Sequence, residues 1–469
     1  MIKLHRGNLS LKLTTWVVLL CWTFPLRAET LADVLVAAYL NSGLIEQNRA
    51  LLRAADEDVA IAAAKLKPIL NWSSSVARSH LDSETAFGAA LESTTTYAIA
   101  GLSAEFLLYD SGISKMSVEA NKQAVLAARQ KLVAVEQSVL LRAVEAFMTV
   151  RRDTDQVNLR DNNLKLIKEE LRAAKDRFAV GEVTRTDVAL AEARLAASRS
   201  ALAAADGALA VAVEEYKAVI GQAPGVLSAS NPELKQVKDL AAAKAVALKQ
   251  HPDIKAAQYR VAIADLAVKQ AELAKRPKVA LLGSIALTEY DGSDAYSRSG
   301  DIKLQASGPL YLGGQIPAAL RKSRAMQDME RKSLHLVSLG VSQNVGTAFA
   351  RLQVATAAKE ASASQIRAAR VAFQGVRQEA AFGARTTLDV LNAEQELLDA
   401  QTSMVSALAD QQIAAYTLRA TLGQMTADKL GLDVPKYNPE AYFATQGRAP
   451  KTSVQGAKLD RILKALGKN

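Results

Sequence analysis

The sequence contains an internal repeat, and a short turn motif is its clearest part. The paired residues, each 202 positions apart, are Gly181 and Gly383, Thr184 and Thr386, Asp187 and Asp389, and, far upstream, Tyr109 and Tyr311. The offset of 202 is the same from residue 109 to residue 187 of the first copy. The chain is therefore expected to consist of two copies of one structural unit, and its fold must accommodate that unit twice.

Two long stretches of the chain, residues 69–223 and 318–434, contain no proline. They are rich in alanine, leucine, glutamine, glutamate, lysine and arginine, which have the highest helix propensities. Apolar residues recur in them at alternating steps of three and four, the spacing of a coiled coil. An unbroken helix over residues 114–177 would be roughly 95 Å long at 1.5 Å per residue. The sequence thus predicts very long helices that pack in pairs.

The repeated motif predicts a turn between two such helices. Each copy has a glycine that can adopt positive φ and end the incoming helix. It then has threonines that can cap the outgoing helix and an aspartate that suits a first helical turn. The residues are Gly181, Thr184 or Thr186, and Asp187 in the first copy, and Gly383, Thr386 or Thr387, and Asp389 in the second. The repeated unit is expected to contain one long helical hairpin.

Four shorter segments have the two-residue periodicity of strands, with one apolar and one more polar face. They cover residues 70–76, 96–108, 278–288 and 301–307, and polar loops are expected at 77–94 and 290–300. Before these loops the repeat offset is 209, as for Pro68 and Pro277, and after them it is 202. The first loop region is therefore longer by seven residues (209 − 202 = 7).

The first 28 residues predict a secretory signal peptide. A basic stretch precedes an apolar run at residues 16–24, and a cleavage site follows at Ala28. The apolar run is too short to cross a bilayer, although a retained anchor is the alternative. The single cysteine, Cys21, lies inside this segment. The predicted mature chain therefore offers no disulfide and no thiolate metal site.

Charge and motif content argue against several classes of protein. The formal net charge is +10, and loss of four cations with the predicted signal peptide would leave +6 (10 − 4 = 6). The charges are interspersed and aromatic residues make up only 5%, unlike a nucleic-acid groove. His80, His251 and His335 lack metal-ligand spacing, and no phosphate loop or nucleophile elbow occurs. We expect no enzyme activity, cofactor, metal site or nucleic-acid partner.

Four amphipathic strands and two long hairpins in a secreted chain pose a physical problem. Four strands cannot close a barrel, and open strand edges cannot stand in lipid. Strands from other subunits could close them, in a barrel with an apolar outer face and a wet lumen. The helices would then extend that barrel as a tube on one side of the membrane.

The order of elements and the motif Phe-x-Val-Gly-x-x-Thr-x-x-Asp-Val closely resemble TolC-like outer-membrane efflux proteins. The strand ends at Gly112 and Gly314 add to this resemblance, which extends to about Lys436. It implies an α+β membrane protein of Gram-negative bacteria, a homotrimer with a shared twelve-stranded outer-membrane barrel and a long coiled-coil α-helical periplasmic barrel. It also implies a passive exit duct for efflux or type I secretion, coupled to an inner-membrane transporter through a periplasmic adaptor protein.

In that family the second turn lies at the periplasmic entrance, where an acidic ring narrows the pore. Matched by motif, Asp389 falls on a ring aspartate, and Asn392 replaces the second ring aspartate. Helix capping without any role in a pore is the alternative for Asp389, because a first-turn aspartate favours the helix dipole in either case.

The resemblance also implies polar latches between inner and outer helices at this entrance. Arg385, Thr186 and Asp187 fall on latch positions, whereas Ala380 stands where the family has a latch tyrosine. Capping is the alternative for Asp187, and simple solvation is the alternative for Arg385. The second turn is therefore the better candidate for a gate.

Tyr109 and Tyr311 lie near the ends of the second and fourth predicted strands. They predict an aromatic girdle at the membrane interface, with ordinary packing as the alternative. Outer-membrane lipid is thus an expected partner of the chain.

The repeat also predicts the domain boundaries. Residues 1–28 form the signal peptide, 29–230 the first repeat of helix, strand pair and long hairpin, 231–424 the second repeat, and 425–469 a C-terminal periplasmic tail with a short amphipathic helix at 458–466. A periplasmic adaptor, which has one long hairpin flanked by β modules, is the main alternative function, and a purely structural coiled coil is another. The exported substrate, drug or protein, is left open.

Overall fold

The computed structural model describes residues 28–84, 90–228, 239–292, 294–435, 437–438 and 461. The predicted signal peptide, apart from Ala28, lies outside the described residues. So does the tail helix predicted at 458–466, apart from Arg461.

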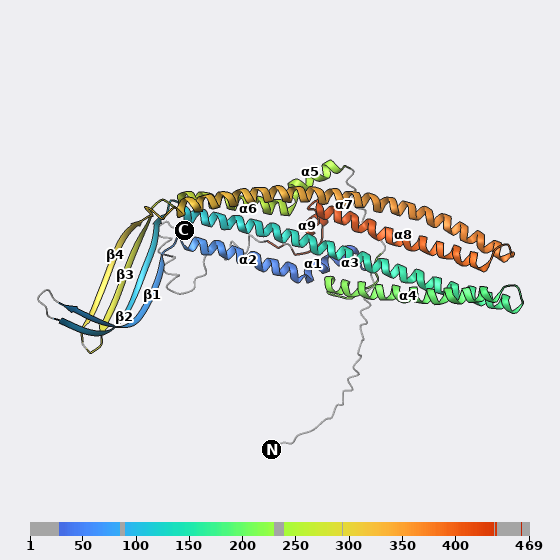
Figure 1. Cartoon of the computed structure of the whole chain (residues 1–469), viewed down its shortest axis with the longest axis horizontal. Coiled ribbons are helices and arrows are strands. Elements are labelled where there is room, and N and C mark those ends of the chain that lie inside the picture. Colours follow the sequence, from blue (N-terminus) through green and yellow to red (C-terminus); the bar gives the residue numbers. More distant parts are fainter. Residues whose placement is uncertain are drawn as a thin grey trace, which may run out of the picture.

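The described residues form an elongated molecule, with a sheet at one end and two helical turns at the other (Figure 1). In chain order the elements are α1 (Leu31–Asn41), α2 (Gly43–Ala64), β1 (Ile69–Glu84), β2 (Ala90–Tyr109), α3 (Ile113–Ala179), α4 (Arg185–Ile220), α5 (Leu240–Gln250), α6 (Pro252–Leu273), β3 (Lys278–Tyr290), β4 (Tyr296–Ser307), α7 (Gln315–Ala381), α8 (Thr387–Thr421) and α9 (Ala427–Leu430). The sequence α-α-β-β-α-α occurs twice, and α3 and α7 each have 67 residues. The helix-rich α+β fold with four strands is as predicted.

The four strands form one antiparallel sheet in the order β1-β2-β3-β4. Ile69 of β1 lies opposite Glu105 of β2, and Lys278 of β3 lies opposite Ser307 of β4. Lys278 follows Ile69 by 209 positions, and Ser307 follows Glu105 by 202 positions, so these pairs show the two offsets of the repeat. The two strand pairs therefore have the same register.

Both strand pairs are longer than the sequence pattern predicts, because residues 296–300, which were expected in the second loop, belong to β4. The first pair differs more. Residues 77–84 and 90–94 were expected in a loop, but they extend β1 and β2, so that His80 lies opposite Thr94. Strand pairing uses backbone groups, and it continues here although the side chains are polar and no longer alternate with apolar ones. The extra residues of the first copy thus lengthen its strands rather than its loop.

One face of the sheet carries exposed apolar side chains. They are Trp72, Val76, Leu102, Ile285, Ile302 and Leu304, which are between 54% and 85% exposed. The other face is more polar, and there Ser284 of β3 donates a hydrogen bond to the carboxylate of Asp301 of β4. The sheet thus has the two unlike faces that the sequence predicts.

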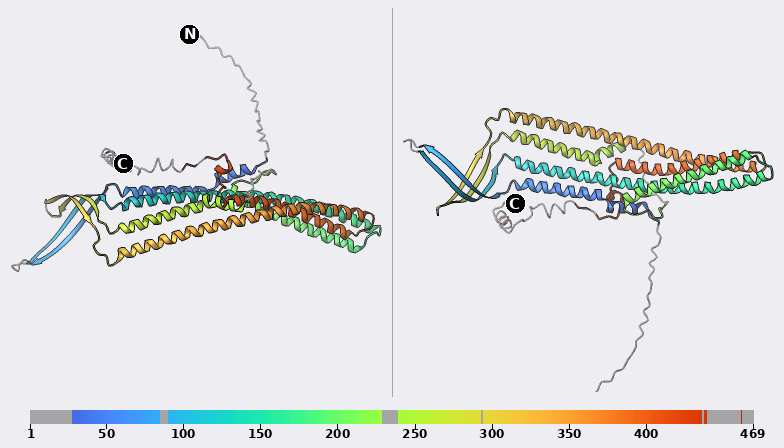
Figure 2. Two further views of the ribbon diagram at one scale, coloured as in Figure 1. Left: turned by 90° about the horizontal axis from the view of Figure 1, so that it is seen from above. Right: turned by 60° about the horizontal axis from the view of Figure 1, so that its bottom comes forward.

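The helices lie side by side in a curved layer (Figure 2). Next to the sheet the order is α2, α3, α6, α7, and in the far half it is α4, α3, α8, α7. Of the described helices, α4 alone has the length and apolar composition of a membrane span, but it packs along α3 as one arm of a hairpin. The two hairpins, α3–α4 and α7–α8, meet where α8 packs on α3.

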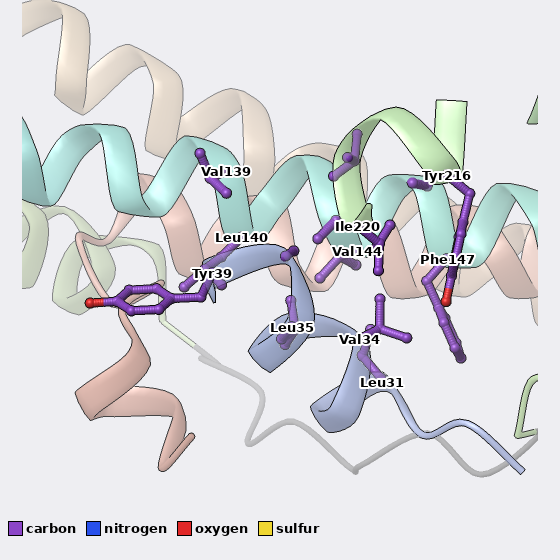
Figure 3. Close-up of a cluster of buried hydrophobic side chains, with 14 of the residues drawn as sticks. Leu31, Val34, Leu35, Tyr39, Val139, Leu140, Val144, Phe147, Tyr216 and Ile220 are labelled. Carbon is purple, nitrogen blue, oxygen red and sulfur yellow. The ribbon is translucent and has the colours of Figure 1, made fainter. Parts of the chain in front are cut away.

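The largest buried cluster lies near the middle of the molecule, where α1 covers α3 and the end of α4 (Figure 3). Phe147, Tyr216 and Ile220 are fully buried there. The side chain of Asn41 at the end of α1 donates to the carbonyl of Ile220 at 2.8 Å. This cluster fixes the short first helix against the first hairpin.

The start of the predicted C-terminal tail also packs on this cluster. Met425 and Ala427 are buried, and the backbone N–H of Ala427 donates to the carboxylate of Glu136 on α3 at 2.7 Å. Burial raises the pKa of Glu136, and this hydrogen bond acts in the opposite direction. Residues 425–430 therefore belong to the packed body of the molecule.

The central cluster gives a prediction for stability. Replacement of Phe147, which is fully buried, by alanine should lower the free energy of unfolding by about 3–5 kcal/mol, because it leaves a cavity. Phe382, which is 89% exposed, provides the matched control, and its replacement by alanine should change that free energy by less than about 0.5 kcal/mol. Denaturant unfolding in detergent, followed by circular dichroism, checks both values. Equal losses for the two variants would contradict the assignment of the core.

Candidate functional site

The two hairpin turns lie together at the end of the molecule opposite the sheet (Figure 1). Gly181 ends the first incoming helix with φ of 82°, and Gly383 ends the second with φ of 78°. The N–H of Gly181 donates to the carbonyl of Phe178 at 3.0 Å, and that of Gly383 donates to the carbonyl of Ala380 at 3.1 Å. Positive φ strains residues with a β-carbon, which explains glycine at both positions.

Each outgoing helix begins with a capping box. In the first turn the hydroxyl of Thr184 accepts the N–H of Asp187 at 3.3 Å, and the Asp187 carboxylate accepts the N–H of Thr184 at 2.9 Å. Thr386 and Asp389 make the same pair of bonds at 3.2 and 3.0 Å. Of the two threonines considered for each cap, the one three residues before the aspartate is used, because only that spacing closes the box.

These bonds fix the charge of both aspartates. Hydrogen bonds from the hydroxyl and the backbone of Thr184 lower the pKa of Asp187. Those from the backbone and the hydroxyl of Thr386 lower the pKa of Asp389. A lowered carboxyl pKa means that the ionised form is the one present at neutral pH. Each turn thus carries a fixed negative charge at its outgoing helix.

Arg385 forms an ion pair within its own hairpin. Its Nε donates to Oε2 of Glu379 at 2.8 Å, across the second turn. This hydrogen bond raises the pKa of Arg385. In the described part of one chain, Arg385 forms no hydrogen bond or ion pair with Thr186 or Asp187, so the predicted latch residues are at the same end of the molecule but are not joined.

Asn392 makes a contact that the sequence did not predict. Nη2 of Arg194 on α4 donates to Oδ1 of Asn392 on α8 at 2.9 Å. The partners are 198 positions apart, and no local pattern pairs them. The bond joins the two hairpins close to their turns, in the region where the family resemblance places the entrance.

A second link between the hairpins lies further from the turns. Nδ2 of Asn163 on α3 donates to Oε1 of Glu394 on α8 at 2.6 Å, and the hydroxyl of Ser198 on α4 donates to Oδ1 of Asn163 at 3.1 Å. Gln156 and Ser406 make a third link, at 3.2 Å. No sequence pattern singled out these residues, although the repeat offset of 202 pairs Glu394 with Glu192 (394 − 192 = 202).

Tyr109 and Tyr311 lie far from the turns, at the junction of the sheet and the long helices. Tyr109 is the last residue of β2, and Tyr311 follows β4. Both side chains are exposed. The predicted girdle therefore involves two residues at corresponding places in the two repeats.

The chemistry of the turns is that of helix ends and ion pairs. Within the described ranges, no three histidine, cysteine, aspartate or glutamate side chains are grouped closely enough to hold a metal ion. The charged and amide groups at this end connect helices to each other, so the arrangement can hold or release hairpins.

Comparison with known proteins gives one family. The family model described as "Outer membrane efflux protein" matches residues 34–222 and 245–424. The outer membrane efflux protein BepC of Brucella suis is 35% identical over 418 residues, which cover 89% of this chain and 90% of BepC. The alkaline protease secretion protein AprF of Pseudomonas aeruginosa is 26% identical over 313 residues, 63% of each chain.

A solved structure shows the same fold. The CmeC outer membrane channel of Campylobacter jejuni superimposes with a TM-score of 0.76 over 96% of this chain and 98% of CmeC. Its sequence identity is only 16%, so this likeness concerns the fold. The curved helical layer and the sheet at its end are thus arranged as in that structure.

The capping boxes give a prediction for the second turn. Replacement of Thr386 by alanine should open the first turn of α8 more often, because it removes a cap worth about 1 kcal/mol. Amide exchange at Asp389, measured by hydrogen–deuterium exchange, should then be roughly fivefold faster. The neighbouring substitution Thr387→Ala is the control and should leave that exchange unchanged. If both variants exchange alike, Thr386 is not the cap.

Proposed function

This chain belongs to the outer membrane efflux protein family, and we propose that three copies of it form one passive channel that crosses the outer membrane and continues through the periplasm. The relatives are outer-membrane efflux and secretion channels, so the predicted family, function and location are confirmed. The alternative of a periplasmic adaptor is not supported. Members of this family are channel proteins, in agreement with the expectation that the chain is not an enzyme.

The proposal rests on the contacts between the first and the second repeat of one chain. The same contacts could form again between the second repeat of one copy and the first repeat of the next. Within one chain β2 pairs with β3, α3 packs on α6, and α3 packs on α8. If each element is replaced by its counterpart in the other repeat, the same contacts join β4 of one copy to β1 of the next, and α7 of one copy to α2 and α4 of the next. In the described chain these elements lie at the edges of the sheet and of the helical layer. A second copy supplies all three missing partners at once.

Each copy offers one edge and accepts the other, so repetition of this contact gives a closed ring if the rotation from copy to copy closes. Closure removes the open strand edges, which cannot stand in lipid. Three copies with four strands each give the twelve-stranded barrel that the family resemblance implies. Six helical hairpins then surround the tube below it.

The two faces of the sheet suit such a barrel. The exposed apolar side chains, which include Trp72 and Ile302, would meet the lipid of the outer membrane. Ser284 and Asp301 on the more polar face would line a wet lumen. Tyr109 and Tyr311, at the junction with the helices, would form a girdle at the membrane interface.

The hairpin turns would form the periplasmic entrance. The fixed negative charge of Asp389, repeated in three copies, would make a ring that favours cations. The seam between α7 of one copy and α4 of the next would bring Arg385 close to Thr186 and Asp187 of its neighbour. This explains why the latch residues are not joined within one chain.

The remaining parts of the proposal follow from the family. We assign residues 1–28 to a signal peptide, 29–230 and 231–424 to the two repeats, and 425–469 to a periplasmic tail whose first residues, 425–430, pack on the body of the molecule. A periplasmic adaptor and an inner-membrane transporter would supply the energy and the substrate. BepC is named for efflux and AprF for protease secretion, so efflux and protein secretion are both candidate roles of the proposed duct.

The repeat predicts the register between neighbouring copies, which tests the assembly. Leu102 lies opposite Ile285 within the chain, and a shift of one repeat places Leu304 opposite Val76 of the next copy. Opposed antiparallel residues are close enough for a disulfide. The double substitution Val76→Cys with Leu304→Cys should therefore give covalent trimers on non-reducing gels of oxidised outer-membrane fractions.

The control for register is Trp72→Cys with Leu304→Cys, which is displaced by four residues and should remain uncrosslinked. Purified trimers should also conduct ions across planar lipid bilayers. Cross-linking of the displaced pair alone would refute the register. A monomer without conductance would refute the channel.

A further inference from the structure

A buried carboxyl group lies in the seam between the two hairpins of one chain. Glu394 on α8 is only 4% exposed, although it is an acidic residue. Its partner Asn163 belongs to α3, and Ser198, which donates to Asn163, belongs to α4. One side chain from each of three helices thus forms a continuous hydrogen-bonded link across the seam.

The surroundings of this link are apolar on the side of the turns. Leu391 of α8 is buried among Ile167, Leu171 and Ala191 of the first hairpin. This cluster separates Glu394 from the solvent around the turns. Together with the Arg194–Asn392 and Gln156–Ser406 bonds, this apolar contact and the carboxyl link hold the second hairpin to the first.

The second oxygen of Glu394 has no evident donor. Oε2 is buried, and within the described residues it has no hydrogen-bond partner. An ionised carboxylate with an unpaired buried oxygen is costly, whereas a neutral carboxylic acid is much less so. The geometry of the site thus suits the protonated form better than the ionised one.

The repeat shows that this environment belongs to the seam and not to the residue type. The corresponding residue of the first copy, Glu192, is exposed and forms an ion pair with Lys175 at 2.8 Å. Lys175 corresponds to Arg377, and among the described residues Arg377 makes no ion pair with Glu394. Within the single chain the two glutamates differ because α8 packs on the first hairpin, whereas α4 lies at an edge, which α7 of the next copy would cover in the proposed assembly.

Charged groups face Glu394 from the packed helices. Burial is the main effect that raises the pKa of Glu394, to about 7, and the negative charge of Glu170 on α3 adds to it. The hydrogen bond from Asn163 and the positive charges of Arg194 on α4 and Arg377 on α7 act in the opposite direction. The group therefore titrates near neutral pH.

We propose that Glu394, with Asn163 and Ser198, is a proton-responsive positioning link that holds the second hairpin against the first above the channel entrance. The inference rests on the proposed function, because the separation of the hairpins matters only if their turns close a pore. When Glu394 is neutral it remains buried and the seam is tight. When it is ionised, the negative charge favours water over the seam, and the hairpins separate more easily.

The sign of the pH effect follows from linkage. The packed seam has the raised pKa of about 7, and a separated, hydrated carboxyl has the ordinary value of 4.5. Between these values the packed form binds more protons, so a fall in pH stabilises it, by up to about tenfold per pH unit. Above pH 7 the carboxyl is ionised in both forms, and the seam is at its weakest.

Conductance of purified trimers in planar lipid bilayers at pH 5.5 to 8 tests the proposal. For the unmodified protein the open fraction should rise several-fold as the pH increases to about 7. Glu394→Gln keeps the shape and remains neutral, so this rise should disappear and the low-pH level should persist. Glu396→Gln, an exposed glutamate on the same helix, removes the same charge and should keep the original profile.

A second variant keeps the test decisive if Glu394→Gln fails to assemble. Asn163→Ala removes the hydrogen bond that favours the ionised form, so the midpoint of the rise should move to higher pH. The ring residue Asp389 has a lowered pKa and does not titrate in this range.

Two outcomes overturn the proposal while the channel stands: a conducting protein whose open fraction is independent of pH, or an unchanged pH profile in Glu394→Gln or, if that variant does not assemble, in Asn163→Ala. No conductance from the unmodified protein would instead refute the proposed function.

Discussion

The unpaired backbone groups of β1 and β4 are the constraint on which the rest of the structure depends. A four-stranded sheet with an exposed apolar face and two open edges is stable neither in water nor in lipid. In the proposed assembly the repeat would solve this problem, because the edge strands β4 and β1 correspond to β2 and β3, which pair in the middle of the sheet. The arrangement of the strands also determines where the long helices begin, since α3 follows β2 and α7 follows β4.

The proposed ring has two kinds of seam between helical hairpins, one within each chain and one between neighbouring chains. The two seams would have the same backbone arrangement but different side chains. Within a chain, Arg194 and Asn392 join α4 to α8. The repeat replaces these two residues by Glu396 and Leu190, which cannot form the same bond between copies. Seams within a chain and seams between chains are therefore held by different residues. In the proposed channel, that difference would let one seam respond to protons while other residues latch the second seam.

Sequence patterns predicted the helices, the four strands, the glycine turns and the repeat, because each depends on neighbours within a few positions. The extents of β1, β2 and β4 were underestimated, since polar residues still pair through their backbones. The links from Asn163 to Glu394 and from Arg194 to Asn392 could not be predicted. Their partners are 231 and 198 positions apart, and only the packing of α8 on the first hairpin brings them together.

The number of copies in the assembled protein and the pairing of its strand edges test the account most directly. Electron cryo-microscopy of the protein purified from outer membranes measures both. The account predicts three copies around one axis, with β4 of each hydrogen-bonded to β1 of the next and the hairpin turns converging at the far end. A monomer, or an assembly in which β1 and β4 remain unpaired, would contradict it.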